Sequence, residues 1–220
     1  MTVVIVDYGS GNLRSAAKAF SHVAAHGGGR ERVVVSDDIR VVAGADRLVL
    51  PGVGAFAACR AAILARPGLM AAIETTVIAR RRPFLGICVG AQLLATRGLE
   101  FGETPGFGWI EGEVRPLAVA GKSWFNDLPL RLPHMGWNAL SLRRTDHPLL
   151  VGIDQGTHMY FVHGYHLVCA REDDVLASTD YGGPVTAMVA RDNIAGVQFH
   201  PEKSQAHGLR LIANFLAWTP

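Results

Sequence analysis

Two short segments of the sequence contain the residue types needed for nucleophilic chemistry. Residues 83–92 read Pro-Phe-Leu-Gly-Ile-Cys-Val-Gly-Ala-Gln, an apolar strand that runs into Cys88 and then into a predicted helix. Residues 197–202 read Val-Gln-Phe-His-Pro-Glu, a second apolar strand that ends at His200, with a carboxylate two residues later. A thiol nucleophile, a histidine base and a carboxylate that orients the histidine suit acyl transfer on an amide or ester. We therefore predict a catalytic triad of Cys88, His200 and Glu202.

Cys88 differs from the other two cysteines in its surroundings. Free cysteines are most often small buried hydrophobic residues, and we interpret Cys59 and Cys169 in that way. Cys88 ends a strand, has Gly86 and Gly90 on either side, and stands just before a helix. Glycines permit a strained turn, and a helix N-terminus favours a thiolate and faces a developing oxyanion. This context indicates a reactive thiol.

His200 is one of nine histidines, so its selection needs an argument. Pro201 restricts His200 to an extended conformation, in which residues two apart face the same side. Glu202 would then hold one imidazole nitrogen while the other faces Cys88. His163, which follows the apolar residues 159–162, is the best alternative base.

A glycine-rich turn at Pro51-Gly52-Val53-Gly54 follows another apolar strand. It can be an ordinary connection, but its glycines also leave the Val53 amide free to turn toward an oxyanion. The Val89 amide, directly after the nucleophile, would be the second donor. One such donor is typically worth about 10²–10³-fold in rate.

Strands and helices alternate in the first half of the chain, which indicates a mainly parallel sheet. The expected strands are residues 3–6, 33–35, 47–50 and 84–87, and the expected helices are residues 12–26 and 55–82, the latter interrupted at Pro67-Gly68. In such sheets the chemistry lies beyond the carboxyl ends of the strands. The motifs after residues 6, 50, 87 and 199 should therefore share one edge.

The second half is richer in short strands, at residues 157–162, 165–169, 185–189 and 194–199, before a closing helix at 205–218. We expect these strands to be antiparallel and to extend the same sheet. The prediction is thus one α/β domain over residues 1–220. Its central sheet is mixed and mostly parallel, flanked by helices, with extra antiparallel strands in the C-terminal half.

Composition excludes several other classes of protein. The net charge of +2 gives no footprint for nucleic acid, and three cysteines without CxxC spacing give no disulfide framework or zinc site. Gly9-Ser10-Gly11-Asn12 begins like a dinucleotide fingerprint, but Arg14 stands where its last glycine belongs. We expect no metal, no cofactor, no signal peptide and no membrane span. A free nucleophilic thiol suggests the reducing cytoplasm.

The cysteine and histidine motifs resemble those of the class I (triad) glutamine amidotransferases, which hydrolyse L-glutamine to glutamate and ammonia on an α/β fold. Four further segments narrow the resemblance to the glutaminase subunits that work in histidine biosynthesis with a cyclase, a (β/α)₈ barrel that makes imidazole glycerol phosphate and AICAR. They are Asp7-Tyr8-Gly9-Ser10-Gly11-Asn12-Leu13, Pro51-Gly52-Val53-Gly54-Ala55-Phe56, Leu132-Pro133-His134-Met135-Gly136-Trp137-Asn138 and His200-Pro201-Glu202-Lys203-Ser204.

The resemblance implies further roles. It places Gln92, Glu100 and the Gly54 backbone around the glutamine substrate. It places Asn12, Trp137 and Lys203 on the face that docks the cyclase in a heterodimer.

Other functions remain open at the level of sequence. The chain could be a glutaminase for another acceptor, such as one in pyridoxal phosphate, anthranilate or guanylate synthesis. It could also be a stand-alone cysteine hydrolase or peptidase, which would turn over without a partner. A non-enzymatic binding module is disfavoured because the triad is intact.

Overall fold

The computed structural model describes residues 1–27, 31–118 and 129–220. Its centre is an eight-stranded sheet with the order β2-β1-β3-β4-β14-β13-β12-β9. These strands are β1 (Thr2–Val6), β2 (Arg32–Ser36), β3 (Arg47–Gly52), β4 (Phe84–Cys88), β9 (Ser141–Leu142), β12 (Val175–Asp180), β13 (Pro184–Arg191) and β14 (Ile194–Val197). Five neighbouring strands, from β2 to β14, run parallel, and β13, β12 and β9 continue the sheet antiparallel.

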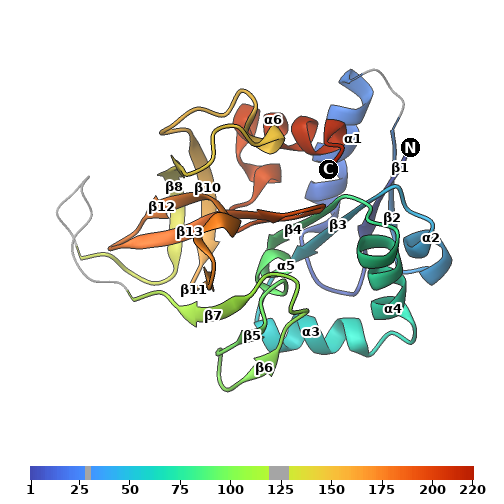
Figure 1. Cartoon of the computed structure of the whole chain (residues 1–220), viewed down its shortest axis with the longest axis horizontal. Coiled ribbons are helices and arrows are strands. Elements are labelled where there is room, and N and C mark those ends of the chain that lie inside the picture. Colours follow the sequence, from blue (N-terminus) through green and yellow to red (C-terminus); the bar gives the residue numbers. More distant parts are fainter. Residues whose placement is uncertain (28–30, 119–128) are drawn as a thin grey trace.

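Helices cover both faces of this sheet (Figure 1). α1 (Leu13–His26) packs against α6 (Gln205–Ala217) on one face, while α2 (Ile39–Ala43), α3 (Phe56–Leu64) and α4 (Leu69–Glu74) lie together on the other. The predicted helix at 55–82 is broken where expected, because Gly68 has a left-handed φ of 78°. A π-turn, η1 (Thr75–Ala79), follows α4. The predicted mixed α/β fold is confirmed.

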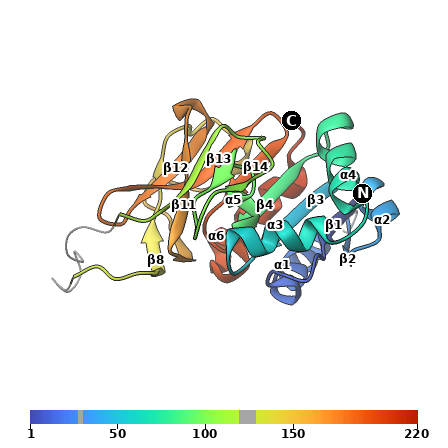
Figure 2. The same ribbon diagram turned by 90° about the horizontal axis from the view of Figure 1, so that it is seen from below.

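Two smaller sheets contain the other strands of the described residues, and Figure 2 shows them at the end of the molecule that also carries β12 and β13. One pairs β10 (His158–His163) with β8 (His134–Ala139); the other has the order β11-β7-β5-β6, formed by β11 (Tyr165–Cys169), β7 (Gly112–Pro116), β5 (Arg97–Gly98) and β6 (Thr104–Pro105). The expectation that segments 157–162 and 165–169 join the main sheet is therefore wrong. β14 also differs from expectation, since it is parallel to β4. A sharp turn at Gly164, between β10 and β11, sends the chain from one small sheet into the other.

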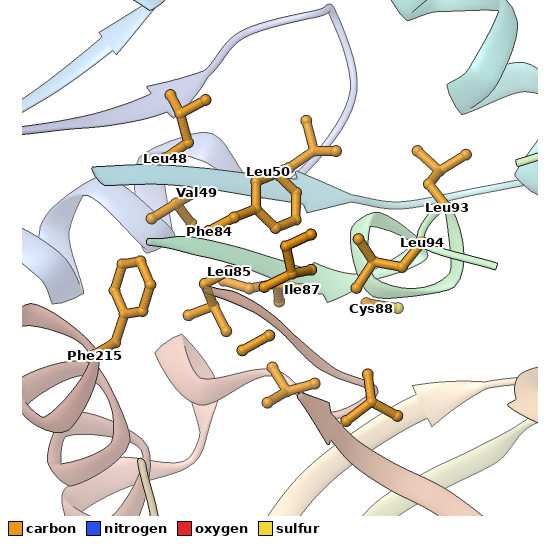
Figure 3. Packing of buried hydrophobic residues seen from close by; sticks show 14 of the residues in the cluster. Leu48, Val49, Leu50, Phe84, Leu85, Ile87, Cys88, Leu93, Leu94 and Phe215 are labelled. Carbon is orange, nitrogen blue, oxygen red and sulfur yellow. The ribbon is translucent and has the colours of Figure 1, made fainter. Parts of the chain in front are cut away.

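The core lies between the sheet and its helices. Leu48, Val49 and Leu50 of β3 and Phe84 and Leu85 of β4 are completely buried. Figure 3 shows these side chains filling the space on both sides of the two strands, with Phe215 of α6 packed from one side. Each such apolar side chain gains about 1.5–3 kcal/mol on burial, so these central strands are the most strongly held part of the chain.

β3 continues further than its sequence suggests. Pro51 and Gly52 do not end the strand but remain in register beside Ile87 and Cys88 of β4. The buried Tyr8 hydroxyl donates a 2.8 Å hydrogen bond to the Pro51 carbonyl, and burial raises the pKa of this phenol. The glycine-rich turn is thereby held directly beside the end of β4.

α5 (Val89–Gln92) packs against the ends of β3 and β4, and only glycine leaves room for this. A Cβ on Gly90 would lie 1.8 Å from the Leu50 carbonyl oxygen, and one on Gly86 would lie 2.5 Å from the Gly90 oxygen. Both obstacles are backbone atoms, which cannot turn aside as a flexible side chain could.

Among the described residues, no single helix is long and apolar enough to cross a membrane. The pair Phe56–Leu64 and Leu69–Ala79, bent by 95°, passes that test together by length and composition alone.

The close approach of α5 predicts a strong effect of one methyl group. Gly90→Ala should destabilise the protein by about 1–3 kcal/mol or more, because the helix must move away from β3. Gly164→Ala is a suitable control, since nothing lies within 4 Å of a Cβ there, and it should change stability by less than about 0.5 kcal/mol. Urea unfolding of both variants measures the difference. Equal stabilities would contradict the packing argument.

Candidate active site

The nucleophile candidate sits on a strained turn between β4 and α5. Cys88 has φ 55° and ψ −114°, a conformation that L residues rarely adopt. Gly86 and Gly90 permit this turn by leaving space for α5, while the positive φ lies on Cys88 itself. The helix that follows has only four residues, so its contribution is a few free amides and not a long dipole.

The two predicted oxyanion donors follow paired positions of the sheet. Gly52 of β3 lies opposite Cys88 of β4, so Val53 and Val89 are each the next residue along. Val89 is buried and begins α5, where the first amides lack intrahelical partners, whereas Val53 is 43% exposed. The parallel ladder thus brings the two amide-bearing residues to one edge beside the sulfur.

Two residues that the sequence did not single out hold the Val53 carbonyl. The Ser10 hydroxyl donates to it at 2.9 Å, and the Cys59 thiol donates at 3.2 Å. Cys59 is buried, as expected, but its thiol is also part of this contact. These bonds fix the direction of the peptide between Val53 and Gly54. Gly54 has a φ of 90°, which suits glycine at this bend.

His200 and Glu202 follow β14 and form a buried pair. His200 has an extended backbone, as predicted, but Glu202 reaches it through a 3₁₀ turn, η4 (Pro201–Lys203), and not through continued extended chain. Nδ1 of His200 lies 2.9 Å from Oε1 of Glu202, and both side chains are 3% exposed or less. Backbone bonds to Tyr160 and Ser204 hold the histidine in place.

The electrostatics of this pair favour a charged imidazole. Burial by itself lowers the pKa of His200, but its interactions with Cys88 and the Glu202 carboxylate outweigh burial and raise that pKa to about 9. Nε2 of His200 is buried and has no hydrogen-bond partner of regular geometry among the described residues. That nitrogen therefore interacts with Cys88 through charge, and it is free to bind a reacting proton.

The alternative base, His163, is committed elsewhere. Its Nδ1 lies 2.9 Å from the Tyr165 carbonyl, and its Nε2 lies 3.0 Å from Nδ1 of His134. The Asn138 amide donates to Nε2 of His134 and to the Asp180 carbonyl. These partners require both imidazoles to be neutral, with the proton on Nδ1 in each ring. Burial lowers the pKa of His163 to about 3 and that of His134 to about 4, so the geometry favours His200 as the base.

The residues expected around the substrate differ in how many of their polar groups are already hydrogen-bonded within the protein. Nε2 of Gln92 donates to the Tyr165 carbonyl and to Oε1 of Gln198, both at 2.9 Å, so only its oxygen remains for a substrate. Oε2 of Glu100 accepts the Phe56 amide at 2.7 Å and so stabilises the start of α3. Gly54 directly follows Val53 in the sequence and has open space beside its Cα.

Cys88 and His200 are only 4% and 2% exposed. A cavity of about 380 Å³ lies elsewhere, over the sheet that contains β5 and β7. Its arginines, Arg97 and Arg115, both pair with Glu113. The chemistry of the buried triad, and not cavity size, therefore identifies the site. No group of three metal-ligating side chains occurs in the described part of the chain.

The three residues expected at a partner interface lie near one another on the surface. The ring of Trp137, 46% exposed, meets the Tyr160 ring edge-on at 5.9 Å, and the Lys203 ammonium lies 5.8 Å from the centre of the same ring. Asn12 precedes α1, which packs against η4. We call Asn12, Trp137, Tyr160 and Lys203 the docking face.

A cysteine on a strained strand-to-helix turn, facing a buried histidine–carboxylate pair at the edge of a doubly covered α/β sheet, defines a class of cysteine-dependent amidohydrolases. A model of the family "Glutamine amidotransferase class-I" matches residues 4–218. Two solved structures share the fold: a glutamine amidotransferase (TM-score 0.70, 20% identity, 97% of both chains) and the glutaminase domain of Trypanosoma brucei CTPS with bound acivicin (TM-score 0.68, 16% identity, 99% of this chain and 92% of the other).

Curated relatives are much more similar. Imidazole glycerol phosphate synthase subunit HisH of Rhodospirillum rubrum is 55% identical over 220 residues, and that of Cereibacter sphaeroides is 56% identical over 220 residues, with both chains covered completely in each comparison. The chain belongs to the class I glutamine amidotransferase family and, within it, to the family of HisH subunits.

The buried histidine pair predicts a loss of stability in acid. His134 and His163 are neutral in the folded protein, whereas an unfolded histidine takes up a proton near pH 6.5. The stability that these neutral histidines contribute is therefore fully present above pH 6.5. It is lost as the pH falls toward their pKa values in the folded protein, about 4 for His134 and about 3 for His163. Replacing both histidines with glutamine should reduce the decrease in the free energy of unfolding between pH 7 and pH 5, as measured by urea unfolding.

His163→Gln alone should flatten that decline in part, in case the double variant does not fold. His207→Gln, on the exposed side of α6, controls for the loss of a histidine as such. An equally steep decline in the double variant and the unmodified protein would show that other groups cause it.

Proposed function

We propose that this protein hydrolyses L-glutamine to glutamate and ammonia at Cys88 and supplies the ammonia to a second subunit. The observation that supports this most directly is the strained Cys88 beside the Glu202-bound His200, in a chain of the HisH family. Relatives bear the name of an imidazole glycerol phosphate synthase subunit, so the acceptor reaction we propose is that of histidine biosynthesis. A glutaminase for another acceptor is disfavoured by the same relatives.

The proposed reaction begins with attack of the Cys88 thiolate on the side-chain amide carbon of glutamine. The carbonyl oxygen becomes an oxyanion, which we propose the Val53 and Val89 amides stabilise, since these residues follow the paired Gly52 and Cys88. Nε2 of the protonated His200 gives its proton to the leaving nitrogen, and ammonia departs from a thioester on Cys88. His200 then takes a proton from water, which attacks the thioester and releases glutamate.

Glu202 orients the base throughout these steps. Its hydrogen bond to Nδ1 of His200 leaves Nε2 as the nitrogen that exchanges protons, and its charge favours the imidazolium. We further propose that Gly54, Glu100 and the oxygen of Gln92 contact the substrate.

The second subunit proposed here is a cyclase with a (β/α)₈ barrel, bound at the docking face in a heterodimer in the cytoplasm. The exposed Trp137 ring and the Lys203 charge provide a mixed apolar and basic surface, which hydrolysis itself does not require. Trp and Tyr are enriched at protein–protein interfaces. Release of ammonia without an acceptor wastes glutamine, so a partner that controls the rate is chemically sensible.

The triad predicts a specific order of losses in glutamine hydrolysis. Cys88→Ala should reduce turnover by at least about 10³-fold, and His200→Ala by a similar amount, because the two act as a unit. Glu202→Gln should cost less, since an amide still holds the ring. Cys169→Ala is the matched control, because burial raises the pKa of that thiol to about 12 and keeps it unreactive.

The measurement is ammonia release at saturating glutamine in the presence of the cyclase. The Cys88→Ala and His200→Ala losses should not add in the double variant. Simple additivity, or retained turnover in Cys88→Ala, would require a different nucleophile or base.

The partner hypothesis predicts that this chain is slow when alone. Ammonia release should rise by about 10²-fold or more only with cyclase and its nucleotide ligand together, because one misplaced oxyanion donor alone has an effect of that size. Three parallel assays, of the chain alone, with cyclase, and with cyclase plus ligand, measure this. Equal rates in all three would favour a stand-alone hydrolase.

A further inference from the structure

A buried pair of glutamine amides lies directly beside the nucleophile. Gln92 of α5 and Gln198, just after β14, are each only 4% exposed. Nε2 of Gln92 donates to Oε1 of Gln198 at 2.9 Å, and Nε2 of Gln198 lies 3.7 Å from the Cys88 sulfur. A buried amide must find partners because it has lost its hydrogen bonds to water. The partner found by the amide nitrogen of Gln198 is the catalytic sulfur.

The direction of the Gln198 amide is determined by its neighbours. A glutamine side chain has one acceptor oxygen and one donor nitrogen, so fixing the oxygen also fixes the nitrogen. Gln92 must donate from Nε2, because its other partner is the Tyr165 carbonyl, which can only accept. Oε1 of Gln198 must therefore face Gln92, and its N–H groups face Cys88.

The Tyr165 carbonyl that orients Gln92 is itself fixed from a second side. Nδ1 of His163 carries a proton and donates to this carbonyl at 2.9 Å. The hydrogen bonds from His163 and from Gln92 therefore meet at one backbone oxygen. The amide beside the sulfur is thereby tied to the rigid interior of the small sheets as well as to α5.

The backbone places Gln198 and His200 for the same target. The backbone N–H of Gln198 continues the β-ladder by donating to the Ala187 carbonyl, and the backbone of His200 is extended. The Gln198 side chain reaches the Cys88 sulfur and His200 interacts with the same thiol, while Phe199 between them is completely buried in the core. The sulfur is thus contacted by an N–H donor from Gln198 and faces the base from His200.

We propose that Gln198 is a positioning residue of the glutaminase reaction, whose amide N–H, directed by Gln92, holds the Cys88 sulfur for attack; this rests on the function proposed above. A donor beside sulfur stabilises the thiolate relative to the thiol and restricts the side-chain rotation of the cysteine. A carboxylate at the same place would present a negative charge instead and disfavour the thiolate.

The first test measures the thiol without substrate or partner. The probe is iodoacetamide, and the rate of labelling of the Cys88 peptide is followed by mass spectrometry as the pH is raised. Gln198→Met keeps the size of the side chain and removes the donor, and it should move the midpoint of labelling up by about one pH unit, a tenfold loss of thiolate. Gln198→Glu should move it further in the same direction. Gln92→Leu should give a smaller shift, because it frees the orientation of Gln198.

The second test measures glutamine turnover with the cyclase. Gln198→Met should lower kcat by about tenfold and change KM by less than about threefold, because the lost contact acts on the sulfur and not on the substrate. Met188→Leu, which changes an apolar neighbour of Gln198, is the control for packing and should leave both the labelling profile and kcat unchanged. Circular dichroism identifies any variant that does not fold, and Gln198→Met remains informative if the charged variant fails.

An unchanged labelling midpoint in folded Gln198→Met would overturn this inference while leaving the proposed function intact. Absence of turnover in the unmodified protein with cyclase would overturn the proposed function instead, and the labelling profile would still decide whether the amide acts on the sulfur.

Discussion

The structure depends on how closely α5 approaches β3 and β4. The backbone of Gly90 touches the Leu50 carbonyl so closely that no side chain fits between them. This contact forces the chain to turn within one residue, and Cys88 takes up the strained conformation. The strain persists because the core strands on either side are fully buried, as Figure 3 shows for β3 and β4. A stable core thus holds the strained turn and fixes the position of the sulfur.

Around that sulfur the parallel sheet arranges every other group. The ends of β1, β3, β4 and β14 lie at one edge because these strands are neighbours and run in the same direction. β3 brings the oxyanion turn beside Cys88, and β14 brings Gln198 and His200. Val53, Val89 and Gln198 each lie one residue beyond the end of their strand, and His200 lies three beyond. Short connections of this kind lose little entropy and hold their side chains rigidly.

The sequence predicted the sheet edge well because its signals are local. Apolar runs identified the parallel strands, and the motif residues followed them directly. The small sheets were not predicted, since the pairing of β8 with β10 depends on contacts between residues 19 to 29 apart and has no periodic signal. The sequence indicated that Gly86 and Gly90 permit the strained turn but not how they do so, because a glycine that provides space and one that provides flexibility look the same in sequence.

Gln198 shows where a usable signal was overlooked. It is a polar residue between Val197 and Phe199 in a strand expected to be buried on both faces, and such a residue must have a buried partner. The partner itself could not be named, because Gln92 and Cys88 are more than one hundred residues away along the chain. Glu202 illustrates the opposite case, in which the predicted contact exists but is produced by a 3₁₀ turn.

Tyr160 belongs to two parts of the molecule at once. Its ring lies in the docking face, in contact with Trp137 and Lys203. Its backbone carbonyl accepts a hydrogen bond from the His200 N–H, and its own backbone N–H donates to the Ser204 hydroxyl. A single rigid residue therefore joins the outer surface to the backbone of the base. A shift of the Tyr160 ring would therefore also shift the backbone that is hydrogen-bonded to His200. The docking face and the catalytic base are thus coupled through one residue.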